Sequence, residues 1–536
     1  MEQQTSSQLF RAYVPATLRD QLSAGLLRAG QIQTYQGTIL YTDLSGFTRL
    51  TATFATLPDG AERLHGILTS YFEVMIATIV ANGGDVIHIA GDALTAWWPG
   101  MTDPALAIHC GHALHNAIAA LNPIATPNGP FTLEIRVGVS VGIVHLLLVG
   151  IPNQGIHPVL IGAPIDAASL AEQQAKPGEV QLLLPAFRPT RFCDYQPPPE
   201  TPILTWEHFL PPSFARRLRL NTLVAEYRRC VPVFAAFDLP EDPTALQPLV
   251  MQAQAIAMRW GGWLNEIEVG NKGAVMVFLF GAPVAHGDDT SRAVGCAIEL
   301  RDRGIIRKAG ITVGSVFVGE VGSRLRRVYT AQGEDMNLAA LLMEQAQPGD
   351  VVISGRVRQD TLGRYRTSPP QQLNVKGYSR SIPAAVVLAK HAFTDERSFS
   401  SLQASLPAYT ELIGRTQERQ MIDHILDVAR QEGQVLLIEG EAGIGKSSLI
   451  HHLSARWIEY GYQGFRGECR SGMQEQPLHL WRNILSELCD IDDGAPMQVR
   501  QARLHHIATT FSSARPQHIA ALAHLFKIDG FDYTTK

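Results

Sequence analysis

An aspartate follows a run of apolar residues in the segment TILYTDLSGFTRL (residues 38–50). Asp43 ends this predicted buried strand, and Ser45 and Gly46 begin the polar turn after it. An unpaired carboxylate in a protein core costs several kcal/mol, so something must offset its charge. One interpretation is a helix N-cap, in which Asp43 or Ser45 accepts backbone N–H bonds. The other is a cation bound beside Asp43.

A second aspartate, Asp92, lies in the turn of a predicted β-hairpin, in the segment IAGDALTAW. In the fold predicted below, this hairpin lies beside the strand that ends at Asp43. Two neighbouring carboxylates raise each other's pKa unless cations lie between them. Mg²⁺ prefers such hard oxygen ligands together with phosphate. Gly46, Phe47 and Thr48 would then present backbone N–H groups to a phosphate at a helix N-terminus.

A third chemical signal lies in QVLLIEGEAGIGKSSLI (residues 434–450). It combines an apolar run that predicts a strand, the pattern GxxxxGK[ST] and a predicted helix, which is the context of a phosphate-binding P-loop. Its glycines let backbone amides wrap the phosphates, its lysine reaches the β- and γ-phosphates, and its serine holds Mg²⁺. The residues in these roles are Gly440, Gly443, Gly445, Lys446 and Ser447.

Composition narrows the class of protein. A chain of 536 residues predicts roughly three or four domains. Its hydrophobic content of 46% indicates a globular protein. Its net charge of −5 is small for this length, so no strong electrostatic attraction draws it to nucleic acid or to an anionic membrane. The six cysteines form no CxxC pair, which argues against a zinc site and a disulfide framework. The N-terminus lacks a signal-peptide pattern, so we expect a cytoplasmic protein with no nucleic-acid or membrane partner.

Two pairs of similar segments indicate an internal repeat. RVGVSVG (136–142) resembles KAGITVG (308–314), and LAEQQAKPGEVQL (170–182) resembles LLMEQAQPGDVVI (341–353). The proline-rich stretch 196–213 predicts a linker between the copies. The expected organisation is an N-terminal helical segment (1–35), a first copy (36–195), a linker (196–227), a second copy (228–390), another linker (391–410) and a final domain (411–536).

The first copy predicts a strand, a helix, two short strands joined at AGD, a second helix (about 104–121) and a glycine-rich strand pair near 132–150, which we interpret as a buried β-hairpin. The order is that of a ferredoxin-like α+β sandwich. We therefore predict an α+β protein with two such domains, followed by a partial α/β P-loop domain. The first helix has one apolar face, formed by Leu64, Ile67, Leu68, Phe72, Met75, Ile76 and Ile79.

These motifs together resemble those of a known family. DLSGFT, GDALTAW and, in the second copy, VGSRLRRVYTAQGEDMNLAALL are similar to the tandem catalytic domains of class III nucleotide cyclases, most closely the soluble, bicarbonate-responsive adenylyl cyclases. The resemblance covers about residues 36–390. It implies an intramolecular pseudo-dimer that converts ATP to cyclic AMP and pyrophosphate at the interface of the two copies. Asp43 and Asp92 would hold two metal ions, Mg²⁺ or Mn²⁺, with Ca²⁺ as an alternative in one position.

The same resemblance implies that the second copy binds the base and the ribose. Lys272 and Thr330 match the adenine-recognition positions, and Asn337 matches the catalytic asparagine that orients the ribose. Plainer interpretations also stand, because Lys272 fits a solvated turn and Asn337 fits a helix cap.

Two departures from the family pattern bear on activity. Leu341 stands four residues after Asn337, where the family has its transition-state arginine. Such an arginine contributes about 10³–10⁵ in rate, so we expect slow turnover or none unless Arg324, Arg326 or Arg327 substitutes for it. The lysine and arginine of the family's bicarbonate pocket are replaced by His88 and Ser169, so bicarbonate activation is not expected. His88 also fits an ordinary strand residue.

The final region suggests a signalling module. ELIGRTQERQMIDHIL resembles the entry segment of the multidomain AAA- and STAND-type ATPases that follow such cyclase pairs, and implies further signalling domains in a full-length protein. No acidic Walker B strand follows the P-loop, so we expect a partial ATPase domain. Two functions result: a metal-dependent adenylate cyclase, slow because of Leu341, or a catalytically inactive nucleotide-binding signalling protein.

Overall fold

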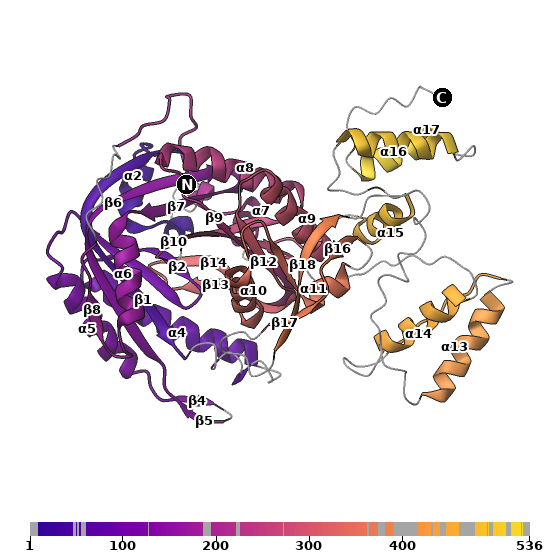
Figure 1. Cartoon of the computed structure of the whole chain (residues 1–536), viewed down its shortest axis with the longest axis horizontal. Coiled ribbons are helices and arrows are strands. Elements are labelled where there is room, and N and C mark those ends of the chain that lie inside the picture. The colour runs from indigo at the N-terminus through magenta and orange to yellow at the C-terminus, as the bar shows by residue number, and fades with distance from the viewer. Residues whose placement is uncertain are drawn as a thin grey trace. The chain divides into compact units, whose positions relative to one another are not determined.

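The structure is a computed structural model of the chain (Figure 1). It divides into two compact units, Met1–Ser354 with Leu373–Ala384, and Gly355–Gln372 with Ala385–Lys536. It describes residues 9–46, 50, 53–54, 60–126, 128–185, 194–220, 226–271, 273–361, 364–373, 381–390, 415–429, 432–439, 446–459, 478–489, 491, 497–510, 516–526 and 528.

The first sheet has the strand order β2-β3-β1-β6-β7, and β8 pairs with β6 in parallel (Figure 1). The central strand β1 pairs antiparallel with β3 on one side and with β6 on the other. The elements of this part are η1 (Arg11–Tyr13), α2 (Ala16–Ser23), β1 (Ile32–Ser45), α4 (Gly60–Ala81), β2 (Asp85–Ala90), β3 (Ala93–Pro99), α5 (Ala105–Ala119), β4 (Ile124–Thr126), β5 (Gly129–Phe131), β6 (Glu134–Ile151), η2 (Pro152–Gln154), β7 (Gly155–Ile161), α6 (Ala163–Gln174) and β8 (Val180–Leu182).

Both faces of the first sheet are covered, because successive strand residues point to opposite sides. Leu40 belongs to a core that contains Phe72 of α4 and Leu114 of α5. Its neighbour Ile39 belongs to the opposite core, with Leu18 of α2 and Ala168 of α6. The predicted succession of a strand, a helix, two strands and a second helix is therefore confirmed, and the fold is mixed α and β.

The second sheet repeats the strand order of the first. β10, β11, β9 and β12 are neighbours in that order, β15 pairs with β12 in parallel, and β13 pairs with both β9 and β14. The single strand β6 corresponds to two strands here, β12 and β13. The elements are η3 (Trp206–Phe209), α7 (Pro212–Arg219), β9 (Glu226–Phe237), η4 (Pro243–Ala245), α8 (Leu246–Arg259), β10 (Trp263–Gly270), β11 (Gly273–Phe280), α9 (Asp289–Asp302), β12 (Lys308–Ile311), β13 (Gly314–Gly322), β14 (Arg327–Gln332), α10 (Glu334–Gln345) and β15 (Val351–Ser354).

A glycine at the same place in both repeats lets a helix pack directly on a strand. A Cβ added at Gly138 would lie 2.0 Å from the carbonyl oxygen of Ala168 in α6. A Cβ added at Gly310 would lie 2.2 Å from the carbonyl oxygen of Ala339 in α10. Only glycine permits this approach, which explains why the glycine recurs in RVGVSVG and KAGITVG.

The prediction of a hairpin within residues 132–150 is wrong. These residues belong mostly to β6, one strand that runs from Glu134 to Ile151 and pairs along its length with β1 and β7. The glycines that suggested turns serve close packing instead: a Cβ at Gly142 would lie 2.9 Å from the ring of Pro164 in α6. Among the described residues, no helix is long and apolar enough to cross a membrane.

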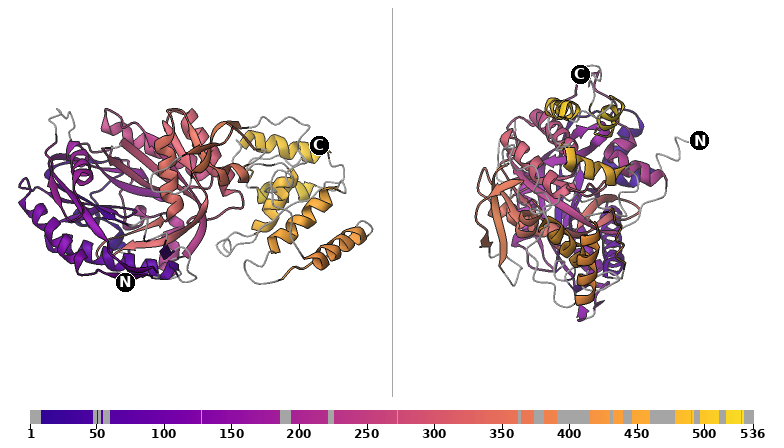
Figure 2. Two further views of the ribbon diagram at one scale, coloured as in Figure 1. Left: turned by 60° about the horizontal axis from the view of Figure 1, so that its bottom comes forward. Right: turned by 90° about the vertical axis from the view of Figure 1, so that its right-hand side faces the viewer.

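The two sheets lie side by side (Figure 2). They contact each other through equivalent elements. Helix α8 of the second repeat meets β6 of the first, where the Gln247 amide bonds both to N–H and to C=O of Gly150. On the other side, Phe317 and Val321 of β13 enter the core that α4 helps to form. The N-terminal residues Phe10 and Tyr13 pack in the core of the second sheet.

A buried arginine joins the repeats. Arg326 is 6% exposed, and its guanidinium donates to the carbonyls of Val86 and Ile87 in β2 and of Tyr13 in η1. Burial lowers the pKa of Arg326 to about 10, and the charge of Asp85 acts in the opposite direction. The guanidinium therefore bonds to backbone carbonyls of two segments that lie far from it in the sequence.

The second unit differs from the prediction around the P-loop. Its elements are α11 (Gly355–Asp360), β16 (Tyr365–Thr367), β17 (Gln371–Leu373), β18 (Ile382–Lys390), α13 (Thr416–Ala429), α14 (Lys446–Glu459), α15 (His479–Cys489), α16 (Met497–Thr510) and α17 (Pro516–Leu525). The expected strand before the P-loop is absent among residues 432–439. Leu436 and Ile438 pack beside α13 and α14, but Val435 is 97% exposed. A parallel strand needs neighbours, and the described residues of 415–528 include only helices as regular elements.

We expect Arg326→Met to destabilise the protein by about 2 kcal/mol, because it leaves the carbonyls of Val86, Ile87 and Tyr13 without their charged donor. Chemical unfolding of the whole chain measures this change. The control is Arg324→Met, which removes the same charge from an exposed position of the same turn and should cost less than about 0.5 kcal/mol. Equal effects of the two substitutions would contradict the assignment.

Candidate functional site

The two predicted acidic residues lie together at the end of neighbouring strands. Asp43 on β1 is paired with Ala93, the first residue of β3, and Asp92 directly precedes it in the turn between β2 and β3. Gly91 takes a positive φ of 56° in this turn. The carboxyl groups share a hydrogen bond. The predicted convergence of Asp43 and Asp92 is therefore present in the structure.

The environment opposes two negative charges at this place. Burial and the neighbouring Asp43 charge raise the pKa of Asp92 well above its ordinary value. Burial also raises the pKa of Asp43, although Arg136 opposes this by bonding to its carboxylate. The shared hydrogen bond raises the pKa of Asp92 and lowers that of Asp43, so a proton held by this pair resides on Asp92, which then donates to Asp43.

Arg136 supplies the positive charge beside Asp43. It is directly opposite Asp43 in the register of β1 and β6. Its Nη2 lies 2.9 Å from Oδ2 of Asp43 and 2.7 Å from Oε1 of Glu172 in α6. The carboxylate of Asp43 therefore has a charged partner, Arg136, and a second acid, Asp92, beside it. Its charge is offset without the helix N-cap that was considered from the sequence.

The acid pair has the chemistry to hold a divalent cation whose other ligands are waters or phosphate oxygens. Among the described residues, no group of three or more histidine, cysteine or acidic side chains could hold a metal ion. Two adjacent carboxylates suffice for Mg²⁺, because this ion usually takes one or two protein carboxylates and completes its shell with waters and phosphate oxygens. A cation would also remove the repulsion that raises the pKa of Asp92.

The sequence analysis missed other charged groups near the pair. The pKa of Tyr41 on β1 is raised well above its ordinary value by burial and then by Glu268, Asp43 and Glu172 in that order. Glu268 lies on β10, so the second repeat contributes charge to the surroundings of the acid pair. The repeat alignment could have pointed to Glu172. It shows an acid in the first copy where the second copy has the apolar Met343.

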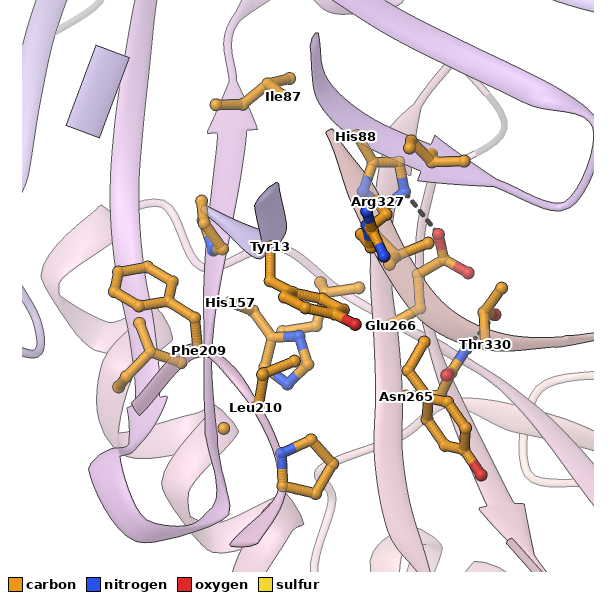
Figure 3. Close-up of a pocket in the computed structure, with 18 of the residues that line it drawn as sticks. Tyr13, Ile87, His88, His157, Phe209, Leu210, Asn265, Glu266, Arg327 and Thr330 are labelled. Carbon is orange, nitrogen blue, oxygen red and sulfur yellow. Dashed lines mark hydrogen bonds and ion pairs between the residues drawn. The ribbon is translucent and has the colours of Figure 1, made fainter. Parts of the chain in front are cut away.

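A cavity of about 90 Å³, lined by both polar and apolar residues, lies between β2 and β7 of the first repeat and β10 and β14 of the second (Figure 3). The predicted purine-binding residue Thr330 lines it and accepts a hydrogen bond from the amide of Asn265 at 3.1 Å. His157 Nε2 and Asn265 Oδ1 are buried there without a hydrogen-bond partner. Burial and then the charge of His88 lower the pKa of His157 to about 4.

An ion pair between the repeats borders this cavity. His88 Nε2 lies 2.8 Å from Oε1 of Glu266 on β10 (Figure 3). Burial works to lower the pKa of His88, but the Glu266 carboxylate outweighs it and the pKa is raised. His88 is therefore more than an ordinary strand residue, because it links β2 to β10. Ser169, the other altered position, donates to Oδ1 of Asn271 at 3.0 Å.

The structure describes some of the remaining predicted site residues and leaves others out. Asn337 lies in the first turn of α10, and Gln332, just before that helix, donates to the carbonyl of Gly91 in the Asp92 turn. The start of α10 therefore lies near the acid pair. Gly46 takes a positive φ of 94° after β1. Phe47, Thr48 and Lys272 lie outside the described residues.

The P-loop residues are mostly outside the described part of the chain. Gly440, Gly443 and Gly445 are among the residues that the structure does not describe. Lys446 and Ser447 begin α14, so the predicted helix after the P-loop pattern is present.

We expect Asp92→Asn to stabilise the protein at pH 8 in the presence of a metal chelator. The raised pKa means that the folded state prefers the protonated acid, so the wild-type protein loses stability as pH rises above the ordinary value of 3.8 toward the folded pKa. The gain of the variant should be about 1 kcal/mol or more at pH 8 and smaller at pH 4.5. Chemical unfolding at both pH values measures it. The exposed Asp20→Asn is the control, and a variant less stable than wild type at pH 8 would contradict the interpretation.

Comparison with known proteins supports the predicted resemblance. Residues 411–527 match the family model described as AAA ATPase domain. Adenylate cyclase type 10 of Homo sapiens is 24% identical over 514 residues, which cover 80% of this chain and 31% of that protein. Its counterpart in Oryctolagus cuniculus is 23% identical, with the same coverage. The chain thus spans about a third of the length of these relatives.

Among solved structures, an adenylyl cyclase of Pseudomonas aeruginosa is 23% identical, with a TM-score of 0.29, over 32% of this chain and 98% of its own. A class III adenylyl cyclase-like ATP-binding protein of the same organism is 13% identical, with a TM-score of 0.43, over 67% and 93%. Over four fifths of its length the chain is homologous to adenylate cyclase type 10, and its last part matches an AAA ATPase domain.

Proposed function

We propose that this chain is a metal-dependent adenylate cyclase that converts ATP to cyclic AMP and pyrophosphate between its two repeats. The observation that carries the proposal is the convergence of Asp43 and Asp92 at one place, with the second repeat bonded to the turn that holds Asp92. The homology to adenylate cyclase type 10 supports the same reaction class.

The proposed reaction needs an intramolecular pseudo-dimer, and the contacts between the repeats support this arrangement. The contacts are reciprocal: α8 of the second repeat meets β6 of the first, and β13 of the second meets α4 of the first. The Arg326 guanidinium and the His88–Glu266 ion pair join the same two halves. The proposed domains have the boundaries predicted above, 36–195 and 228–390.

Each half has a separate task in the proposed reaction. Asp43 and Asp92 would hold Mg²⁺ or Mn²⁺, with Ca²⁺ as an alternative in one position, and the bound ions would supply charge neutralisation at the phosphates and activation of the ribose 3′-hydroxyl. Thr330, with Lys272, would contact the purine, and Asn337 would orient the ribose. The polar turn at Gly46 would face phosphate oxygens with its N–H groups.

A second candidate is a catalytically inactive nucleotide-binding protein. Leu341 occupies the position of the transition-state arginine, and two of the three nearby arginines, Arg326 and Arg327, have other partners. Arg326 donates to backbone carbonyls, and Arg327 lies 3.1 Å from Glu320. In this alternative the repeats bind ATP and signal to residues 411–536, where Lys446 and Ser447 would hold a second nucleotide with Mg²⁺. Either protein would act in the cytoplasm.

The test is cyclic AMP formation from ATP with Mg²⁺ or Mn²⁺. We expect product that requires the metal and that falls by at least about 100-fold in Asp43→Ala, because an essential phosphate-neutralising charge is lost. The exposed Asp20→Ala is the control for charge removal. Saturable ATP binding without any product would favour the inactive alternative.

Leu341→Arg tests the missing cation. A guanidinium that stabilises charge on the transferred phosphate would raise kcat, by about tenfold or more, with little change in ATP affinity. Leu341→Lys distinguishes a placed guanidinium from added positive charge, since Lys lacks the planar fork of donors. An unchanged kcat in Leu341→Arg would show that the missing cation belongs elsewhere.

A further inference from the structure

The Arg136 guanidinium lies between two carboxylates that have different surroundings. One, Asp43, belongs to the proposed metal site, and the other, Glu172, is a 4% exposed side chain on α6. Nη2 of Arg136 reaches both, at 2.9 and 2.7 Å. One cation therefore serves two acids.

The backbone holds these three groups in fixed relative positions. Arg136 is directly across from Asp43 in the ladder between β1 and β6. Glu172 is held against β6 because α6 packs on Gly138, where an added Cβ would lie 2.3 Å from the backbone nitrogen of Glu172. Strand register and helix packing leave the rotamers of Arg136 as the adjustable part of the arrangement.

The second repeat lacks the same arrangement. Lys308 corresponds to Arg136, and its ammonium donates to the carbonyls of Glu344 and Ala346 at the end of α10. Met343 corresponds to Glu172. Arg136, with its two carboxylates, thus lies in the first repeat, which also carries the acid pair. In the second repeat, Lys308 instead caps the end of α10.

We propose that Arg136 is an internal counter-cation for Asp43, that a divalent ion displaces it when it binds, and that Glu172 then retains Arg136. This inference rests on the metal site of the proposed function. In this role Arg136 is a positioning residue, since it affects the metal ion through Asp43. A metal ion at Asp43 repels the guanidinium, and Glu172 offers it a second carboxylate without a change in backbone.

Two opposite effects on metal affinity follow. Removing the Arg136 charge removes a competitor and frees the negative charge of Asp43, so Mn²⁺ should bind more tightly. Removing the Glu172 charge leaves Arg136 with Asp43 alone, so Mn²⁺ should bind more weakly. A residue that merely supports the local fold would weaken binding whichever of the two were changed.

The experiment measures binding of Mn²⁺ alone to the whole chain by electron paramagnetic resonance. The same titration of Asp43→Asn is subtracted to remove Mn²⁺ bound elsewhere. Arg136→Met should bind Mn²⁺ about fivefold to twentyfold more tightly, as expected for loss of one close charge. Arg136→Lys should return the affinity to near the wild-type value, and Glu172→Gln should weaken it by about threefold or more.

Lys308→Met is the matched control. It removes a cation from the corresponding position of the second repeat and should leave Mn²⁺ affinity unchanged. Thermal unfolding gives a second measurement: Mn²⁺ should raise the melting temperature of Arg136→Met more than that of the wild type, because tighter binding to the folded state gives more stabilisation. If Arg136→Met does not fold, Arg136→Gln takes its place.

The outcomes separate the inference from the proposed function. If Asp43→Asn binds Mn²⁺ as the wild type does, the proposed metal site fails. Suppose that Asp43→Asn loses Mn²⁺ binding but Arg136→Met and Arg136→Gln bind Mn²⁺ no more tightly than the wild type. The counter-cation role of Arg136 is then wrong, and the proposed metal site is retained. Unchanged affinity in Glu172→Gln would overturn the role given to Glu172.

Discussion

Two acids that share a hydrogen bond at the ends of neighbouring strands impose the main constraint on this protein. Their charges cannot both persist in a partly buried place without a cation, which is why the pKa of Asp92 is raised and why Arg136 bonds to Asp43. The surrounding architecture follows from holding them there. β1 and β3 fix their spacing, β6 brings the arginine, and α6 brings Glu172 to its other side.

The second constraint is the contact between the repeats. Arg326, in the second half, bonds to a backbone carbonyl of β2 in the first half and to that of Tyr13 in η1, and the cavity beside it is bordered by the His88–Glu266 ion pair. Such buried polar contacts fix geometry more than they add stability, because desolvation offsets much of their energy. The two halves are therefore held in one relative arrangement across the place where Thr330 and the acid pair are expected to act together.

The accuracy of the sequence predictions depended on whether the signal was local. The apolar spacing from Leu64 to Ile79 predicted α4, and the AGD turn predicted the hairpin that holds Asp92, because each pattern needs only its own neighbours. The glycines of residues 137–150 led to the wrong prediction of a β-hairpin, because they allow α6 to approach β6 and do not form a turn. The apolar run before the P-loop likewise looked like a strand, but strand formation requires a pairing partner that lies elsewhere in the chain.

The sequence by itself determined the repeat, the positions of Asp43, Asp92 and Asn337 within predicted elements, and the P-loop pattern, because spacing and residue type are properties of the chain alone. Only the tertiary structure decided that Arg136 and Glu172 serve Asp43, that Arg326 joins the halves, and that His88 meets Glu266. These pairs are separated by tens to hundreds of residues, and strand register and helix packing, which no local pattern encodes, bring them within bonding distance.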